Sequence, residues 1–90
     1  MPRKSLAEDL LNQFEEEDKE GDFLVIYDFP GKTKAEFYHN LKRIFAAQAD
    51  GGLVQRSVVH CCKLKTAKSA KALAAHYGAK TLLYEVKGGP

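Results

Sequence analysis

The chain has 90 residues, of which 44% are hydrophobic and 29% are charged, and its formal net charge is +2. These values are ordinary for one globular domain with a modest core, and a second copy would help to bury apolar surface. The longest apolar run is too short to span a membrane, and the first residues lead into an acidic segment instead of an apolar signal region. We therefore expect a cytoplasmic protein of one domain that can dimerise and that has no membrane segment.

The net charge conceals an acidic and a basic part of the chain. Residues 1–22 carry eight acidic and three basic residues, whereas residues 23–90 carry four acidic and eleven basic ones. The basic surplus favours a polyanionic partner, most often nucleic acid, because neutralised phosphates contribute affinity that does not depend on base sequence. The alternative is a lysine-rich surface that serves only solubility.

The acidic part contains a short helix and a charged segment. Residues 5–8 fit a capping box, and one helical face then carries Leu6, Leu10, Leu11 and Phe14. Residues 15–22 are almost wholly charged, which is typical of a solvated linker. We expect an arm over residues 1–22 that docks through its leucines, lies across a basic groove in place of nucleic acid, or frays.

Residues 23–30, with the sequence FLVIYDFP, predict the central strand of the fold. Five apolar or aromatic residues follow one another without alternation, which is typical of a strand covered on both faces. Asp28 ends the run, and Pro30 then turns the chain away because proline cannot extend a ladder. A carboxylate at this point either lies at the solvent edge of the sheet or serves chemistry.

A helix is predicted after this strand. A capping box from Thr33 to Glu36 precedes the stripe Phe37, Leu41, Ile44 and Phe45, and residues 50–52 end the segment with a turn. Amide donors and lysines at the start of this helix, beside Asp28, suit a phosphate. The nucleic-acid contacts that we expect here are Lys32, Lys34, Lys42 and Arg43.

The second half of the chain predicts further strands and a helix. Residues 53–62 read as one long bulged strand or as a tight hairpin, because polar residues interrupt their β pattern. Residues 66–78 predict a helix with an alanine-rich face that ends at Gly78, and residues 80–87 predict the last strand. Lysines near the start of this helix oppose its dipole and suit an anion. The expected nucleic-acid contacts are Arg56, Lys63, Lys65, Lys68 and Lys71.

The order of these elements indicates the fold class. Two helices connected by right-handed crossovers to an antiparallel or mixed sheet give the ferredoxin-like α+β sandwich. We therefore expect a βαββαβ domain over residues 23–90, in which the first and last strands are neighbours or near neighbours. An acidic arm over residues 1–22, partly helical or disordered, precedes this domain.

Two short motifs resemble a known family. The strand that ends in Tyr27-Asp28 and the segment Val54-Gln55-Arg56-Ser57-Val58 are similar to the CRISPR-associated spacer-acquisition protein family Cas-two. The resemblance implies a ferredoxin-like homodimer that binds double-stranded nucleic acid and works with the CRISPR integrase in antiviral defence. In some members it also implies a Mg²⁺-dependent nuclease, for which Asp28 would be the catalytic and metal-binding residue, paired with its symmetry mate.

Three functions follow as hypotheses. The first is a non-catalytic homodimeric adaptor for double-stranded DNA, which we favour because the charge distribution supports binding directly. The second is a metal-dependent endonuclease for DNA or RNA, including a toxin-like ribonuclease of the VapD kind. One Asp28 per chain is too few for Mg²⁺, so this hypothesis needs the second carboxylate of a dimer. The third is a protein-interaction module whose N-terminal helix docks on a partner.

The histidines and cysteines carry weaker signals. Cys61 and Cys62 are the only cysteines, and adjacent cysteines lack the C-x-x-C spacing of zinc and thioredoxin-like sites. In a strand their side chains point to opposite faces, which disfavours a joint metal site with His60. We expect two free thiols, and we expect His39 and His76 to be surface residues and not general bases.

Overall fold

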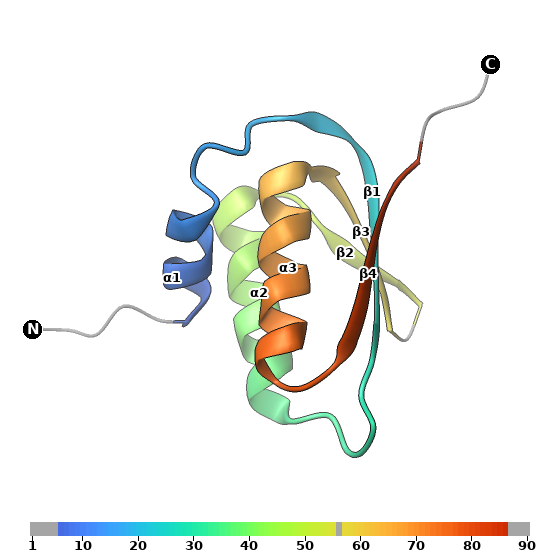
Figure 1. The fold of residues 1–90 in the computed structure, drawn as a ribbon. Helices are drawn as coiled ribbons and strands as arrows, with labels where there is room; N and C mark the ends of the chain where they lie inside the picture. The colour runs from blue at the N-terminus through green and yellow to red at the C-terminus, as the bar shows by residue number, and fades with distance from the viewer. Residues whose placement is uncertain (1–5, 56, 87–90) are drawn as a thin grey trace, which may run out of the picture.

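The computed structural model describes residues 6–55 and 57–86. The elements follow in the order α1 (Leu6–Gln13), β1 (Glu20–Asp28), α2 (Ala35–Gln48), β2 (Gly52–Gln55), β3 (Val58–Lys63), α3 (Leu64–His76) and β4 (Lys80–Val86). Together they make a small α+β fold with one sheet and helices on one side of it (Figure 1), compatible with the predicted ferredoxin-like class. None of the helices in this described part combines the length and apolar character that a bilayer span requires.

The four strands form one antiparallel sheet in the order β2-β3-β1-β4. β1 is central and β4 is its neighbour, as predicted, and Val25 lies opposite Val59 in β3 and Leu83 in β4. Burial alternates along β1, with Phe23, Val25 and Tyr27 buried and the residues between them only partly buried. The expectation that β1 is covered on both faces is therefore wrong. Its unbroken apolar run arises because the face without helices is apolar as well.

The helices build a single core on the sheet. α2 and α3 lie side by side on one face, and α1 packs against both of them (Figure 1). The predicted stripe of α2 is buried at Phe37, Leu41 and Ile44. The alanine-rich face of α3 packs on β1, β3 and β4, where small side chains allow close approach. Leu10 and Leu11 of α1 are 7% exposed, so the apolar face of α1 is buried in the same core.

Residues 53–62 were expected to form either one long bulged strand or a tight hairpin, and the structure has the hairpin, made of β2 and β3. Ser57 has a φ of 72°, the positive value that two-residue hairpin loops require. Arg56, the other residue between the strands, lies outside the described residues. At the end of α3, Gly78 has a φ of 92°, and the Ala79 N–H donates to the Ala74 carbonyl at 3.0 Å. Gly78 therefore ends α3 as predicted.

Three element starts differ from expectation. The N-cap residue of α2 is Lys34, which makes no side-chain cap hydrogen bond, so the predicted capping box at Thr33 is wrong. α3 begins at Leu64, two residues before the predicted start. β1 begins at Glu20, because ladder pairing with β3 extends the strand into the charged segment that was expected to be a linker. The N-terminal capping box involves Ser5, which lies outside the described residues.

Candidate nucleic-acid interface

Asp28 ends β1 where three connections of the chain converge. The loop after β1 and the turn between α3 and β4 lie at this end of the sheet (Figure 1), and Lys80 faces Asp28 in the ladder. The Tyr27 N–H donates to the Ser57 carbonyl at 3.0 Å, which ties the β2–β3 connection to the same end. Asp28 is exposed, and among the described residues its carboxylate has no hydrogen bond or ion pair.

A hollow beside Asp28 is the place where a metal ion would have to bind. Its other lining residues are Phe29, Gly31, Thr33, Tyr38 and Ser57. Mg²⁺ prefers an octahedral set of oxygens and is usually held by one or two carboxylates together with substrate phosphates. Within the described residues, Asp28 belongs to no group of three acidic, histidine or cysteine side chains. Asp28 is the one carboxylate among the described residues that line the hollow, so a Mg²⁺ ion here would need further oxygens from a substrate phosphate or from a second chain.

Three exposed lysines surround the Asp28 end. Lys32 and Lys34 lie in the connection between β1 and α2, and Lys80 begins β4. The predicted residues Lys42 and Arg43 are exposed on α2. Sequence reasoning missed Lys80, because only the antiparallel pairing of β1 with β4 brings it to Asp28. These lysines supply positive charge on the surface around the Asp28 carboxylate.

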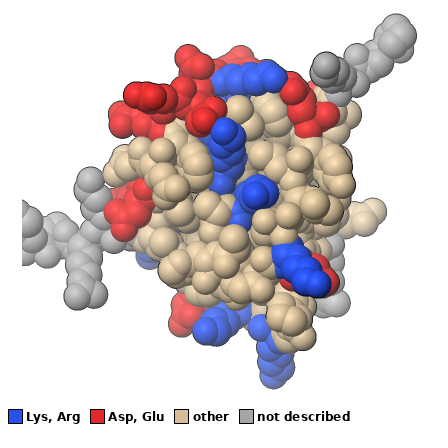
Figure 2. Space-filling view, viewed as in Figure 1, with Lys and Arg blue, Asp and Glu red and all other residues tan. Residues whose placement is uncertain are grey.

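The remaining predicted lysines lie at the opposite end of the helical layer. α2 and α3 run in opposite directions (Figure 1), and Lys63 Nζ donates to the carbonyl of Gln48 at the end of α2 at 2.9 Å. Lys68 pairs with Glu17 at 2.7 Å. The hollow that Lys63 and Lys65 line is also lined by the acidic residues Glu15, Glu17, Asp18 and Glu20. Figure 2 shows acidic side chains gathered at this end of the visible face.

The predicted basic residues therefore do not form one patch. The lysines of the β3–α3 junction are accompanied by carboxylates of the segment that follows α1, whereas Lys32 and Lys34 lie apart from that segment. Lys71 is partly exposed on α3. Arg56 lies outside the described residues, so its prediction is not tested by the structure.

Asp50 has a role that local sequence spacing does not reveal. Its carboxylate accepts the N–H of Cys62 at 2.8 Å and the N–H of Lys63 at 2.9 Å. Partial burial favours the neutral acid, but these hydrogen bonds outweigh that effect and hold the pKa of Asp50 below its usual value. Since Lys63 is the N-cap residue of α3, Asp50 places negative charge at the positive end of the helix dipole.

The two cysteines lie on opposite faces of β3, as predicted. Cys61 is buried in the core, and this burial, reinforced by the nearby Asp50 carboxylate, raises the pKa of its thiol to about 12. Cys62 is an exposed free thiol on the face without helices. Cys61 is therefore a packing residue, and Cys62 is the thiol available to solvent.

Comparison of the chain with protein-family models, with curated proteins and with solved structures found no match. The resemblance of residues 27–28 and 54–58 to the spacer-acquisition family therefore stays a prediction. What the chain does is argued below from its own geometry and charge.

Proposed function

We propose that the chain is a homodimeric adaptor that binds double-stranded DNA through the Asp28 end of its sheet. The observation that carries the proposal is the set of exposed lysines Lys32, Lys34 and Lys80 around Asp28, which belongs to no group of three metal-binding side chains among the described residues. Such a surface attracts phosphates but does not by itself hold Mg²⁺. For this reason we favour binding without cleavage.

The distribution of charge over the molecule supports the orientation of this contact. The acidic residues Glu15, Glu17, Asp18 and Glu20 lie together at the end away from Asp28. A duplex is repelled by that end and attracted to the other, so the electrostatic field orients the encounter. The strand order β2-β3-β1-β4, with α2 and α3 as the crossover helices, supports a ferredoxin-like βαββαβ sandwich as the scaffold.

The open face of the sheet supports the homodimer. On this face Leu82, Tyr84 and Val86 of β4 are 54%, 50% and 44% exposed, beside the partly buried Leu24 and Ile26 of β1. Contiguous exposed apolar surface marks interaction sites, and a small domain gains most from covering it. A second copy packed through the same face would form a two-fold contact and present two lysine-bearing ends to one duplex. The CRISPR integrase, suggested by the resemblance, is the proposed protein partner.

Retardation of a labelled DNA duplex at several salt concentrations tests the adaptor. The double variant Lys32→Gln/Lys34→Gln should bind about tenfold more weakly than wild type, with a salt slope smaller by roughly 2. The matched control, Lys65→Gln/Lys68→Gln, removes two lysines from the acidic end and should have a much smaller effect. Equal losses in the two double variants would contradict the proposed contact.

The alternative is a metal-dependent nuclease, which the exposed and unpaired Asp28 favours. The wild type and Asp28→Asn are incubated with DNA and RNA duplexes in Mg²⁺, in Mn²⁺ and in EDTA. The adaptor predicts intact substrate in every lane and undiminished binding by Asp28→Asn. Cleavage that disappears both in EDTA and in Asp28→Asn would establish the nuclease instead.

A further inference from the structure

Three side chains with metal-binding atoms meet at the other end of β1 from Asp28. Asp22, His60 and Cys62 each offer one ligand atom, and these atoms all lie within 4.8 Å of one another. The Asp22 Oδ1 lies 3.0 Å from the His60 Nε2. Among the described residues, this is the one group of three such side chains. It lies at the far end of the sheet from Asp28, on the face without helices, where Asp22 pairs with Val86 and His60 pairs with Leu24 beside the proposed dimer contact.

Strand pairing builds this cluster. His60 and Cys62 are two positions apart on β3, so both point to the face without helices. The pairing of β1 with β3 shifts between Glu20 and Phe23, which pair with Lys63 and Cys61. β1 thus carries one more residue than β3 in this interval, as in a β-bulge. Bulges re-aim side chains beside functional sites, and here Asp22 contacts the imidazole on the neighbouring strand.

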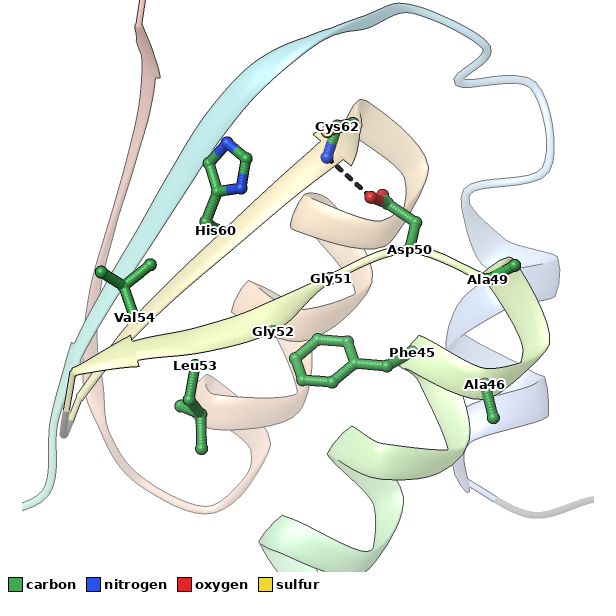
Figure 3. A pocket seen from close by; sticks show the side chains of 10 residues that line it. All are labelled: Phe45, Ala46, Ala49, Asp50, Gly51, Gly52, Leu53, Val54, His60 and Cys62. Atoms are coloured by element: carbon green, nitrogen blue, oxygen red, sulfur yellow. Dashed lines mark hydrogen bonds between the residues drawn. The ribbon is translucent and has the colours of Figure 1, made fainter.

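A hollow leaves the cluster accessible from the side of β2. His60, Cys62 and Asp50 line it together with Gly51 and Gly52 (Figure 3). Gly52 lies opposite His60 in the ladder, and a Cβ built on Gly52 would meet no atom within 4 Å. The absence of a side chain at Gly52 leaves space for an ion and its outer ligand beside the imidazole and the thiol.

The electrostatic environment favours a cation. The carboxylate of Asp22 lies within 4.8 Å of the Cys62 thiol, and the carboxylate of Asp50 accepts the Cys62 backbone N–H at 2.8 Å. The same carboxylates would stabilise a divalent ion placed among them. Asp50 uses its two oxygens to accept the N–H groups of Cys62 and Lys63, so it acts on the site through its charge and by holding the Cys62 backbone.

We propose that Asp22, His60 and Cys62 bind one zinc ion, with a fourth coordination position open toward the hollow. Thiolate, imidazole and carboxylate form a donor set that suits Zn²⁺ and not Mg²⁺ or Ca²⁺, which prefer oxygen alone. In a tetrahedral zinc site the ligand atoms lie roughly 3.5 Å apart, given bond lengths of about 2.0–2.3 Å. The ligand atoms of the three side chains are up to 4.8 Å apart, and rotation of the side chains would bring them to this distance.

Titration of the reduced 90-residue chain with Co²⁺, a spectroscopic substitute for Zn²⁺, tests the site. We expect thiolate-to-cobalt charge-transfer absorption that saturates at one ion per chain and disappears when Zn²⁺ is added. Cys62→Ser should abolish this absorption. His60→Gln and Asp22→Asn should each weaken cobalt binding tenfold or more. His39→Gln, which removes an exposed histidine on α2, is the matched control and should bind as wild type does.

Folding of the variants is checked by circular dichroism and urea unfolding without metal, so that loss of the ion is not confused with loss of the fold. Wild type without charge-transfer absorption, or Cys62→Ser with undiminished absorption, would overturn the proposal. Saturation at half an ion per chain would also overturn it, because the ion would then be shared between two chains. Failure of DNA binding would leave this site standing, since the cobalt assay contains no nucleic acid.

Discussion

Gly51 is a position where the residue type decides the local structure. It has a φ of +104°, and a Cβ there would lie 2.4 Å from Cδ1 of Phe45. We expect Gly51→Ala to lower the free energy of unfolding by about 1–3 kcal/mol, because backbone strain and displacement of the ring both destabilise the fold. In Gly52→Ala the added methyl group enters open space, so the change should stay within about 0.5 kcal/mol. Urea unfolding compares the two variants, and equal losses would contradict this account.

Asp50 links stability to pH. Its folded pKa is held below the unfolded value by two amide hydrogen bonds. The stabilisation is therefore complete above the unfolded pKa, about 3.9, and is lost as the pH falls from there through the folded pKa. Asp50→Asn should cost about 1–2 kcal/mol at neutral pH, since a carboxylate that accepts two hydrogen bonds is replaced.

The measurement is the urea midpoint of unfolding as a function of pH. The stability difference between wild type and Asp50→Asn should shrink as the solution becomes more acidic. Asp9→Asn, which changes an exposed carboxylate on α1, should follow the wild-type curve. A difference between wild type and Asp50→Asn that is the same at every pH would show that Asp50 acts by packing and not by charge.

At the scale of elements, α1 is the part whose role the sequence left open. Leu10 and Leu11 are buried, and α1 contacts both α2 and α3. Leu10→Ala should lower the free energy of unfolding by about 2–3 kcal/mol, because a buried side chain is removed from a packed core. Gln13→Ala, on the exposed side of the same helix, should change it by less than about 0.5 kcal/mol. A frayed arm would make both changes neutral.

At the scale of the whole molecule, the open sheet face is the surface that a second copy would cover. Leu82 and Tyr84 are about half exposed there. If this face forms the dimer, Leu82→Lys/Tyr84→Lys should shift the mass in solution from two chains to one, because buried unpaired charges oppose association. Ala47→Lys, on the exposed side of α2, is the control and should leave the mass unchanged. Light scattering after gel filtration measures the mass of wild type and of the two variants. A wild-type mass equal to one chain would contradict the dimer.

Much of the fold follows from local patterns. The apolar run from Phe23 to Tyr27 predicted the central strand, and the stripe on residues 37–45 predicted α2, since periodicity records which side chains must leave water. Element ends were predicted less well. Lys34, and not Thr33, is the N-cap residue of α2, because the final geometry of a cap depends on how the preceding loop packs. The hairpin in residues 52–63 carries no glycine, proline or asparagine between its strands, so its turn had no local signal.

By itself, the sequence determined most of the strands and helices, the division into acidic and basic parts and the placement of Cys61 and Cys62 on opposite faces of a strand. Only the tertiary structure decided which side chains meet: Lys80 beside Asp28, Glu17 beside Lys68, and Asp22 beside His60. The reason is that periodicity encodes burial within one element, whereas contacts between distant residues depend on strand order, register and a local bulge. Spacing along the chain predicted Lys32 and Lys34 beside Asp28, but Lys80 at that end and Asp22 beside His60 are distant contacts that spacing could not reveal.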